Sequence, residues 1–191
     1  MKIVIAPNTF KGSLDATKAA ESIQKGLTKV LPQAEIIIHP VADGGDHTLK
    51  VVTGKVSSKI LSIDSFDPLS RLITGRYGIL KDNTALIEMA VCSGIHLLKK
   101  NELNAGKASS YGTGLLIKDA LERNIKKIYL GVGGTASMDA GTGILKALGF
   151  RFLDKNRKEL PEGGEELIRL HKIVFPEDQE KYEEFELLID R

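Results

Sequence analysis

The stretch Leu130 to Gly143, LGVGGTASMDAGTG, decides the expected fold, because it has the features of a strand end, a glycine-rich turn and a helix start. The residues from Ile125 to Leu130, IKKIYL, are dominated by β-branched and aromatic side chains, which favour a strand. Helix-forming residues run from Ile144 to Leu148, and Gly149 is placed to end that helix. The stretch therefore predicts a strand, a turn and a helix in succession.

Glycine-rich turns of this kind can bind anions, because their backbone N–H groups converge and the following helix adds its positive dipole end. The loop lacks the G-x-x-x-x-G-K-[ST] pattern of a Walker A motif. Its candidate groups are the backbone of Gly133 and Gly134, the hydroxyls of Thr135 and Ser137, and the Asp139 carboxylate, which suits Mg²⁺. The alternative is a connection that needs glycine only for its backbone geometry.

Composition places the chain among ordinary globular proteins. Its 191 residues are 42% apolar and 27% charged, and a net charge of +2 makes no electrostatic case for nucleic acid or a membrane surface. The single cysteine, Cys92, excludes an internal disulfide and fits a reducing compartment. Its apolar neighbours indicate a buried, inert thiol. The N-terminal apolar run is too short for a signal peptide, so we expect a cytoplasmic protein.

The first part of the chain has the pattern of a βαβ unit. Lys2–Ala6, KIVIA, and Ala34–His39, AEIIIH, are short apolar runs typical of buried parallel strands. The residues between them have an apolar face at helical spacing, with Ser13 or Asp15 near the start and Pro32 as a stop. This order predicts a parallel sheet.

Two loops follow these strands, at the carboxyl edge where α/β proteins bind ligands. The side chains expected to converge there are those of Lys11, Ser13, Asp43 and Asp46. Gly44 and Gly45 would let a ligand approach the backbone closely. The alternative is a tight turn that carries a solvated acid pair.

The pattern of apolar and polar residues changes after residue 52. Partly alternating runs near 56–63, 72–80 and 84–89, joined by turn-like segments, predict three antiparallel strands. A helix from about 110 to 123, a short strand at 151–154, a solvated acidic face at 176–186 and a last apolar run at 187–189 follow. We therefore expect an α/β protein with a βαβ start at 1–51. A second, mixed α/β domain with antiparallel strands is expected at 52–191.

Six motifs that follow one another along the chain, none of them decisive alone, together give it a specific resemblance to one protein family. They are MKIVIAPNTFKGSL at the start, PVADGGDHT at 40–48, ALIEMAVCSGIHLL at 85–98, SSYGTGLLIKDAL at 109–121, LGVGGTASMDAGTGILKALGFRFLD at 130–154 and KELPEGGEEL at 158–167. With these motifs the chain resembles the bacterial two-domain glycerate kinases, which phosphorylate D-glycerate with ATP. The resemblance implies a Rossmann-like domain with a second α/β domain inserted into it.

The resemblance also implies residue roles in a reaction of Mg·ATP with glycerate, where catalysis rests mostly on positioning and charge neutralisation. Lys11 would neutralise a phosphate or the glycerate carboxylate. Asp43 would orient the attacking hydroxyl or hold Mg²⁺, and Asp139 would be a second metal or substrate acid. The phosphate would be cradled at Gly133, Gly134 and Thr135. Further substrate or phosphate contacts would come from Ser13, Gly44, Gly45 and Ser137.

Several positions depart from the family pattern. Asn8-Thr9 stands where the family usually shows Asp-Ser, and Asp46-His47 stands where it usually shows Glu-Gly. In the central loop Met138 and Ala140 replace Asn and Gly, so that Met138 removes an amide and Ala140 disfavours a positive φ.

Length is the largest departure, since family chains are roughly double this length. Two hypotheses therefore compete: a glycerate kinase, whole or as one piece of a split chain, and a non-catalytic anion-binding or interaction protein of the same fold. In both cases we expect self-association or a complementary C-terminal half to cover an open sheet edge.

Overall fold

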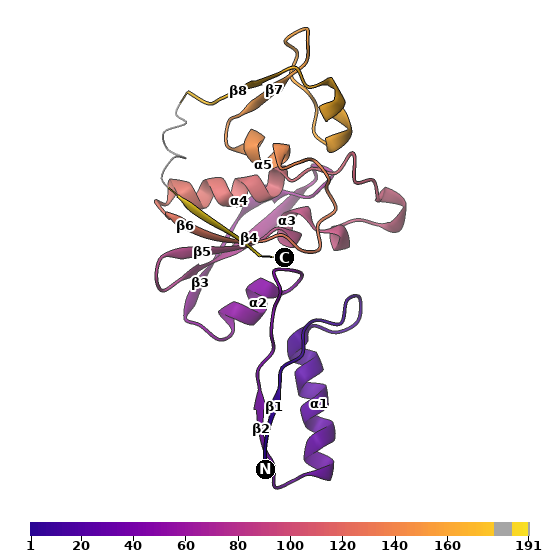
Figure 1. Cartoon of the computed structure of the whole chain (residues 1–191), viewed down its shortest axis with the longest axis vertical. Coiled ribbons are helices and arrows are strands. Elements are labelled where there is room, and N and C mark those ends of the chain that lie inside the picture. Colours follow the sequence, from indigo (N-terminus) through magenta and orange to yellow (C-terminus); the bar gives the residue numbers. More distant parts are fainter. Residues whose placement is uncertain (178–184, 191) are drawn as a thin grey trace.

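The computed structural model describes residues 1–177 and 185–190, and it contains three separate sheets (Figure 1). The first is a parallel pair, β1 (Lys2–Ile5) with β2 (Glu35–Ile38). The second has five strands in the order β3-β4-β5-β6-β9, and the third is the antiparallel pair β7 (Arg151–Leu153) with β8 (Lys172–Val174). This mixture of helices with parallel and antiparallel strands confirms the expected α/β class.

The helices lie between these strands in the chain. They are α1 (Ala16–Val30), α2 (Thr48–Thr53), α3 (Ala90–Ser93), α4 (Tyr111–Glu122), α5 (Thr142–Ala147) and the short 3₁₀ turns η1 (Ile95–Leu97), η2 (Lys100–Glu102) and η3 (Gly164–Arg169). In the part of the chain that the structure describes, no helix combines the length and apolar character that crossing a membrane requires.

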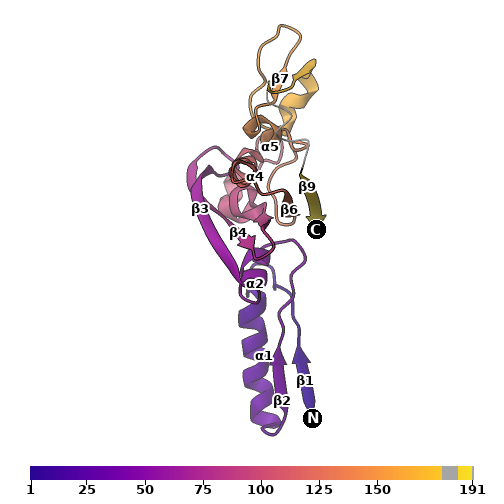
Figure 2. The same ribbon diagram turned by 90° about the vertical axis from the view of Figure 1, so that its left-hand side faces the viewer.

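The β1–α1–β2 unit forms as the sequence predicts. Asp15 caps α1, because its carboxylate accepts the Lys18 N–H at 2.9 Å. The helix ends at Val30, and the cap residue Leu31 directly precedes Pro32. α1 lies along one face of the two strands (Figure 2). The expectation of strands buried on both faces is wrong: among the described residues nothing covers Val4, which is 60% exposed.

The five-stranded sheet begins with the predicted antiparallel meander. β3 (Ser58–Phe66), β4 (Leu72–Leu80) and β5 (Thr84–Glu88) pair in sequence order through short turns. β5 then pairs in parallel with β6 (Lys127–Gly131), which pairs in parallel with β9 (Glu186–Asp190). α4 is the crossover between the parallel strands β5 and β6, as such connections require.

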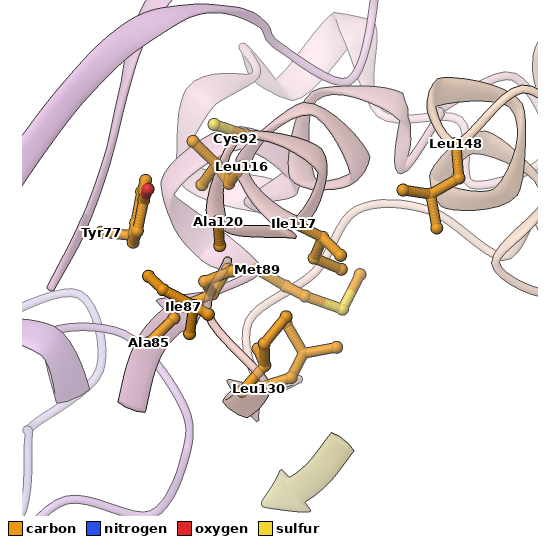
Figure 3. Packing of buried hydrophobic residues seen from close by; sticks show 12 residues of the cluster. Tyr77, Ala85, Ile87, Met89, Cys92, Leu116, Ile117, Ala120, Leu130 and Leu148 are labelled. Carbon is orange, nitrogen blue, oxygen red and sulfur yellow. The ribbon is translucent and has the colours of Figure 1, made fainter. Parts of the chain in front are cut away.

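The core lies between this sheet and α4 (Figure 3). Its fully or nearly fully buried members include Tyr77, Ile87, Cys92, Leu116, Ile117, Ile128 and Leu130. Tyr77 keeps its hydroxyl satisfied by donating to Asp119 Oδ2 at 2.6 Å. The expected burial of Cys92 is confirmed, and this burial raises the pKa of its thiol to about 11.

Two sequence predictions remain predictions here. The expected domain boundary near residue 52 falls inside α2, which connects the β1–α1–β2 unit to the five-stranded sheet. The expected acidic face at 176–186 lies largely outside the described residues, which omit 178–184.

The start of α1 gives a testable prediction about pH. Asp15 Oδ2 accepts from Lys50 Nζ at 2.8 Å, and this contact, helped by the Lys18 N–H, lowers the pKa of Asp15 from 3.8 to about 2. A depressed pKa means that the contribution to stability is present above about pH 4 and is lost as the pH falls toward 2. Asp15→Asn keeps a capping oxygen but loses the ion pair, so we expect it to cost about 1–2 kcal/mol at pH 7.

Urea unfolding of both proteins between pH 3 and pH 7 measures this cost. The two stabilities should converge as the pH falls below 4. A difference that stays constant across this range would contradict the assignment.

Candidate functional site

Two glycine loops from distant parts of the chain touch through their backbones. The Gly133 N–H donates to the Gly44 carbonyl at 3.0 Å. A Cβ atom on Gly133 would lie 2.6 Å from Gly45 Cα, and one on Gly131 would lie 2.6 Å from the Gly44 oxygen. We expected Gly44 and Gly45 to let a ligand approach. In the structure the group that approaches this backbone is the other loop.

A small hollow of about 100 Å³ lies where the two loops meet. Its lining residues are Asn8, Thr9, Lys11, Asp43, Gly45, Asp46, Gly133 and Gly134. The expectation that Lys11 and Asp43 share one cleft is therefore confirmed. A cation, two carboxylates and three glycines surround a space large enough for a small anion.

Asp43 is exposed and held by two short contacts. Its Oδ2 accepts from Asn8 Nδ2 at 2.8 Å, and its Oδ1 accepts from the Gly45 N–H at 3.2 Å. Asn8 is the position where the family pattern shows an aspartate. Here the amide donates to Asp43, which removes the repulsion that a second carboxylate would cause at this distance.

A larger cleft of about 620 Å³ adjoins the hollow and shares Thr9 and Asp46 with it. Its charged and titratable lining includes Asp46, His47, Lys50, Arg76, Glu88 and His96. Ser13 also lines this larger cleft and does not line the hollow that contains Lys11.

Asp46 stands on the wall between the two cavities. Its Oδ1 is buried and has no hydrogen-bond partner within the described part of the chain. The Nδ1 atom of the His96 imidazole lies 3.7 Å from it. A buried carboxylate oxygen without a partner is costly, which is typical of a site that a ligand completes.

Glu88 was not singled out in the sequence. It is 5% exposed, and its Oε1 and Oε2 accept the N–H groups of His47 and Leu49, each at 2.9 Å. Burial raises the pKa of Glu88, although the two N–H groups act against this rise. The sequence feature that could have identified Glu88 is a single acidic residue at the end of an otherwise uncharged strand, TALIE.

Asp139 lies apart from both cavities and is buried. Its Oδ2 accepts the N–H and the hydroxyl of Ser110 at 2.8 and 2.7 Å, and the N–H groups of Gly143 and Gly141 complete its contacts. The binding of an external anion at the dipole end of this helix stays a prediction, and N–H groups at this end already donate to a side chain of the protein. The chain's own Asp139 occupies that place, at the starts of α4 and α5.

The remaining loop residues also lie outside the two cavities. Thr135 pairs through its backbone with Gly94, and Ser137 is half-buried. Met138 points outward and is 78% exposed. Ala140 adopts a φ of +52°, so the expectation that alanine would keep this position out of the left-handed region is wrong.

Magnesium needs a separate test, because no group of three or more metal-binding side chains occurs among the described residues. Kinases commonly hold Mg²⁺ with one or two carboxylates and the substrate's phosphates. Asp43 and the unpartnered oxygen of Asp46 provide such a pair at the hollow. The residues present therefore fit a metal bound together with phosphate.

With this geometry in view, sequence comparison is decisive. The model of the glycerate kinase family matches residues 3–190. The chain belongs to the glycerate kinase family. It is 40% identical over 174 residues to glycerate kinase of Haemophilus influenzae and 38% identical over 174 residues to glycerate 2-kinase of Escherichia coli. Each match covers 91% of this chain and 46% of the relative.

A solved structure gives the same result for the fold. A crystal structure assigned to glycerate kinase 2 of Salmonella typhimurium LT2 superposes with a TM-score of 0.77 at 32% identity, over 99% of this chain and 51% of that one. This member of the glycerate kinase family thus spans about half the length of the relatives it matches.

The position of Asp139 gives a prediction that separates structural from chemical roles. Asp139→Ala removes a buried acceptor and leaves N–H groups at two helix starts without partners. We expect a loss of about 3 kcal/mol of unfolding free energy, measured by urea denaturation. Asp64→Ala, which changes an exposed acid on β3, is the control and should cost less than about 0.5 kcal/mol. Equal stability of the two variants would contradict this role.

Proposed function

We propose that this chain forms part of a glycerate kinase active site, in which the γ-phosphoryl group of ATP is transferred to a hydroxyl of D-glycerate to give phosphoglycerate. The observation that carries the proposal is that Lys11, Asp43 and the backbone of Gly133 and Gly134 line one hollow beside a larger cleft. Membership of the family supports it. The alternative, a non-catalytic binding protein, is favoured by no comparable observation.

The hollow suits the phosphoryl group. Phosphoryl transfer needs charge neutralisation and alignment more than covalent chemistry. Lys11 would neutralise a phosphate oxygen, and the missing side chains at Gly133 and Gly134 keep room for it. Asp43, fixed by Asn8 and the Gly45 N–H, would orient the attacking hydroxyl or hold the metal.

Asp46 replaces Asp139 in this proposal as the second metal-binding acid. Asp43 and Asp46 would hold Mg²⁺, which would neutralise phosphate charge when bound. The larger cleft, within the size range of ligand pockets, would take the organic part of a substrate. Arg76 and Ser13 on its walls are then candidates for contacts with anionic or hydroxyl groups.

A complementary partner would complete the molecule. Val4 in β1 is 60% exposed, and Ile189 in the edge strand β9 is 64% exposed. Exposed apolar side chains on open strands favour association. Since the chain spans about half the length of its relatives, we propose that a C-terminal half or a second copy covers these strands.

We also propose a cytoplasmic location. The lone cysteine supports it, because Cys92 is fully buried and packs as an apolar side chain, as in proteins of reducing compartments.

Asp43 gives the first test. Asp43→Ala should lower turnover of ATP and D-glycerate at least about 100-fold, because it removes hydroxyl or metal positioning. The variant should keep the wild-type melting temperature, since Asp43 is exposed. A coupled enzyme assay measures the effect in the form of the protein that is active, either the chain alone or the chain with a C-terminal half. Asp64→Ala is the control. Turnover equal to that of wild type would refute the role of Asp43.

The second test concerns the isolated chain. We expect it to be a weak or inactive kinase that self-associates, because it spans about half the length of its relatives and carries exposed apolar side chains on β1 and β9. Light scattering should give a mass above that of one chain, and turnover should rise when a C-terminal half is added. A monodisperse monomer with turnover of roughly 1–100 s⁻¹, as kinases show, would contradict this expectation.

A further inference from the structure

Glu88 is an unexpected residue for its place in the fold. It ends β5, where all five residues are buried. A buried carboxylate is unfavourable unless its oxygens are hydrogen-bonded, so packing alone would favour an apolar side chain here. Both Glu88 oxygens are used on the N–H groups of His47 and Leu49, which lie 41 and 39 residues away in the chain.

The end of β5 holds two loops at once. We call residues 43–47 the acid loop and residues 131–134 the glycine loop. The Glu88 side chain binds the end of the acid loop, while the N–H of its neighbour Met89 donates to the Gly131 carbonyl at 2.9 Å. The bond from Gly133 to Gly44 then joins the two loops directly.

The acid loop also carries backbone strain that needs support. His47 has a φ of +71°, a left-handed conformation that a residue with a Cβ atom adopts at a cost. Its N–H is one of the two that Glu88 accepts. The carboxylate therefore compensates for a turn that aims Asp43 and Asp46 at the hollow.

We infer that Glu88 is a positioning residue of this site: it fixes the acid loop against the glycine loop and so sets where Asp43 and Asp46 stand relative to Gly133 and Gly134 on the walls of the hollow. The inference rests on the proposed function for its chemical meaning. The positioning itself is a property of the two loops and can be measured without substrate.

The test is amide hydrogen exchange on the full chain with Glu88→Gln. Glutamine has the same shape, but its NH₂ group faces a backbone N–H and one of the two bonds is lost. Exchange should become at least about tenfold faster at His47 and Leu49 and also at Gly133, which lies in the other loop and does not touch Glu88. Ser109, whose N–H donates to Pro68 far from the loops, should keep its rate.

The matched control is Glu102→Gln. Glu102 Oε2 accepts the Lys99 N–H at 2.8 Å, a similar bond that lies outside both cavities. This variant should leave Gly133 unchanged. If Glu88→Gln does not fold, Glu88→Asp replaces it, because the shorter side chain keeps the charge but does not reach both N–H groups.

The outcomes separate a positioning role from a merely local one. Faster exchange at Gly133 supports the inference. Faster exchange confined to His47 and Leu49, or no change in a folded variant, overturns it. In an assembly that turns over, Glu88→Gln should also lower turnover about tenfold or more while Glu102→Gln does not. Absence of turnover in the wild-type protein would count against the proposed function. The amide-exchange result would then test the positioning role of Glu88 by itself.

Discussion

The backbone contact between Gly133 and Gly44 is the constraint on which the rest of the site depends. It joins a loop after β2 to a loop after β6, and it is so close that a Cβ atom on Gly131 or Gly133 would clash with the backbone of Gly44 and Gly45. Because backbone atoms on both sides fill the contact, the two loops have little freedom to slide. The hollow beside it, with Lys11 and Asp43 on its walls, takes its shape from this junction.

Acidic side chains carry out two different tasks around this junction. Glu88 and Asp139 are buried and accept backbone N–H groups at helix starts, so they hold loops in place. Asp43 and Asp46 line the hollow, and Asp46 Oδ1 has no hydrogen-bond partner among the described residues. The same functional group thus acts as structural support where it is buried against backbone N–H groups, and is a candidate metal or hydroxyl contact where it lines the hollow.

Local patterns in the sequence predicted much of this architecture. The cap at Asp15, the βαβ order and the meander all depend on residues close in the chain, and the carboxyl-edge rule was enough to bring Lys11 and Asp43 together. Glu88 and Asp139 were beyond such reasoning, because their partners lie 41 and 29 residues away. The exposure of Val4 was missed for a related reason. Burial depends on which other parts of the protein cover a strand, and the residues of the strand itself do not reveal this.

The most direct test of this account is the stability of Gly133→Ala. The new Cβ would lie 2.6 Å from Gly45 Cα, so the loops would have to separate. We predict a loss of about 2 kcal/mol in urea unfolding and faster amide exchange at Gly45. Gly26→Ala in α1, where a Cβ meets nothing within 4 Å, should instead stabilise the protein slightly. A Gly133→Ala variant with wild-type stability and wild-type exchange at Gly45 would contradict the claim that this contact sets the site.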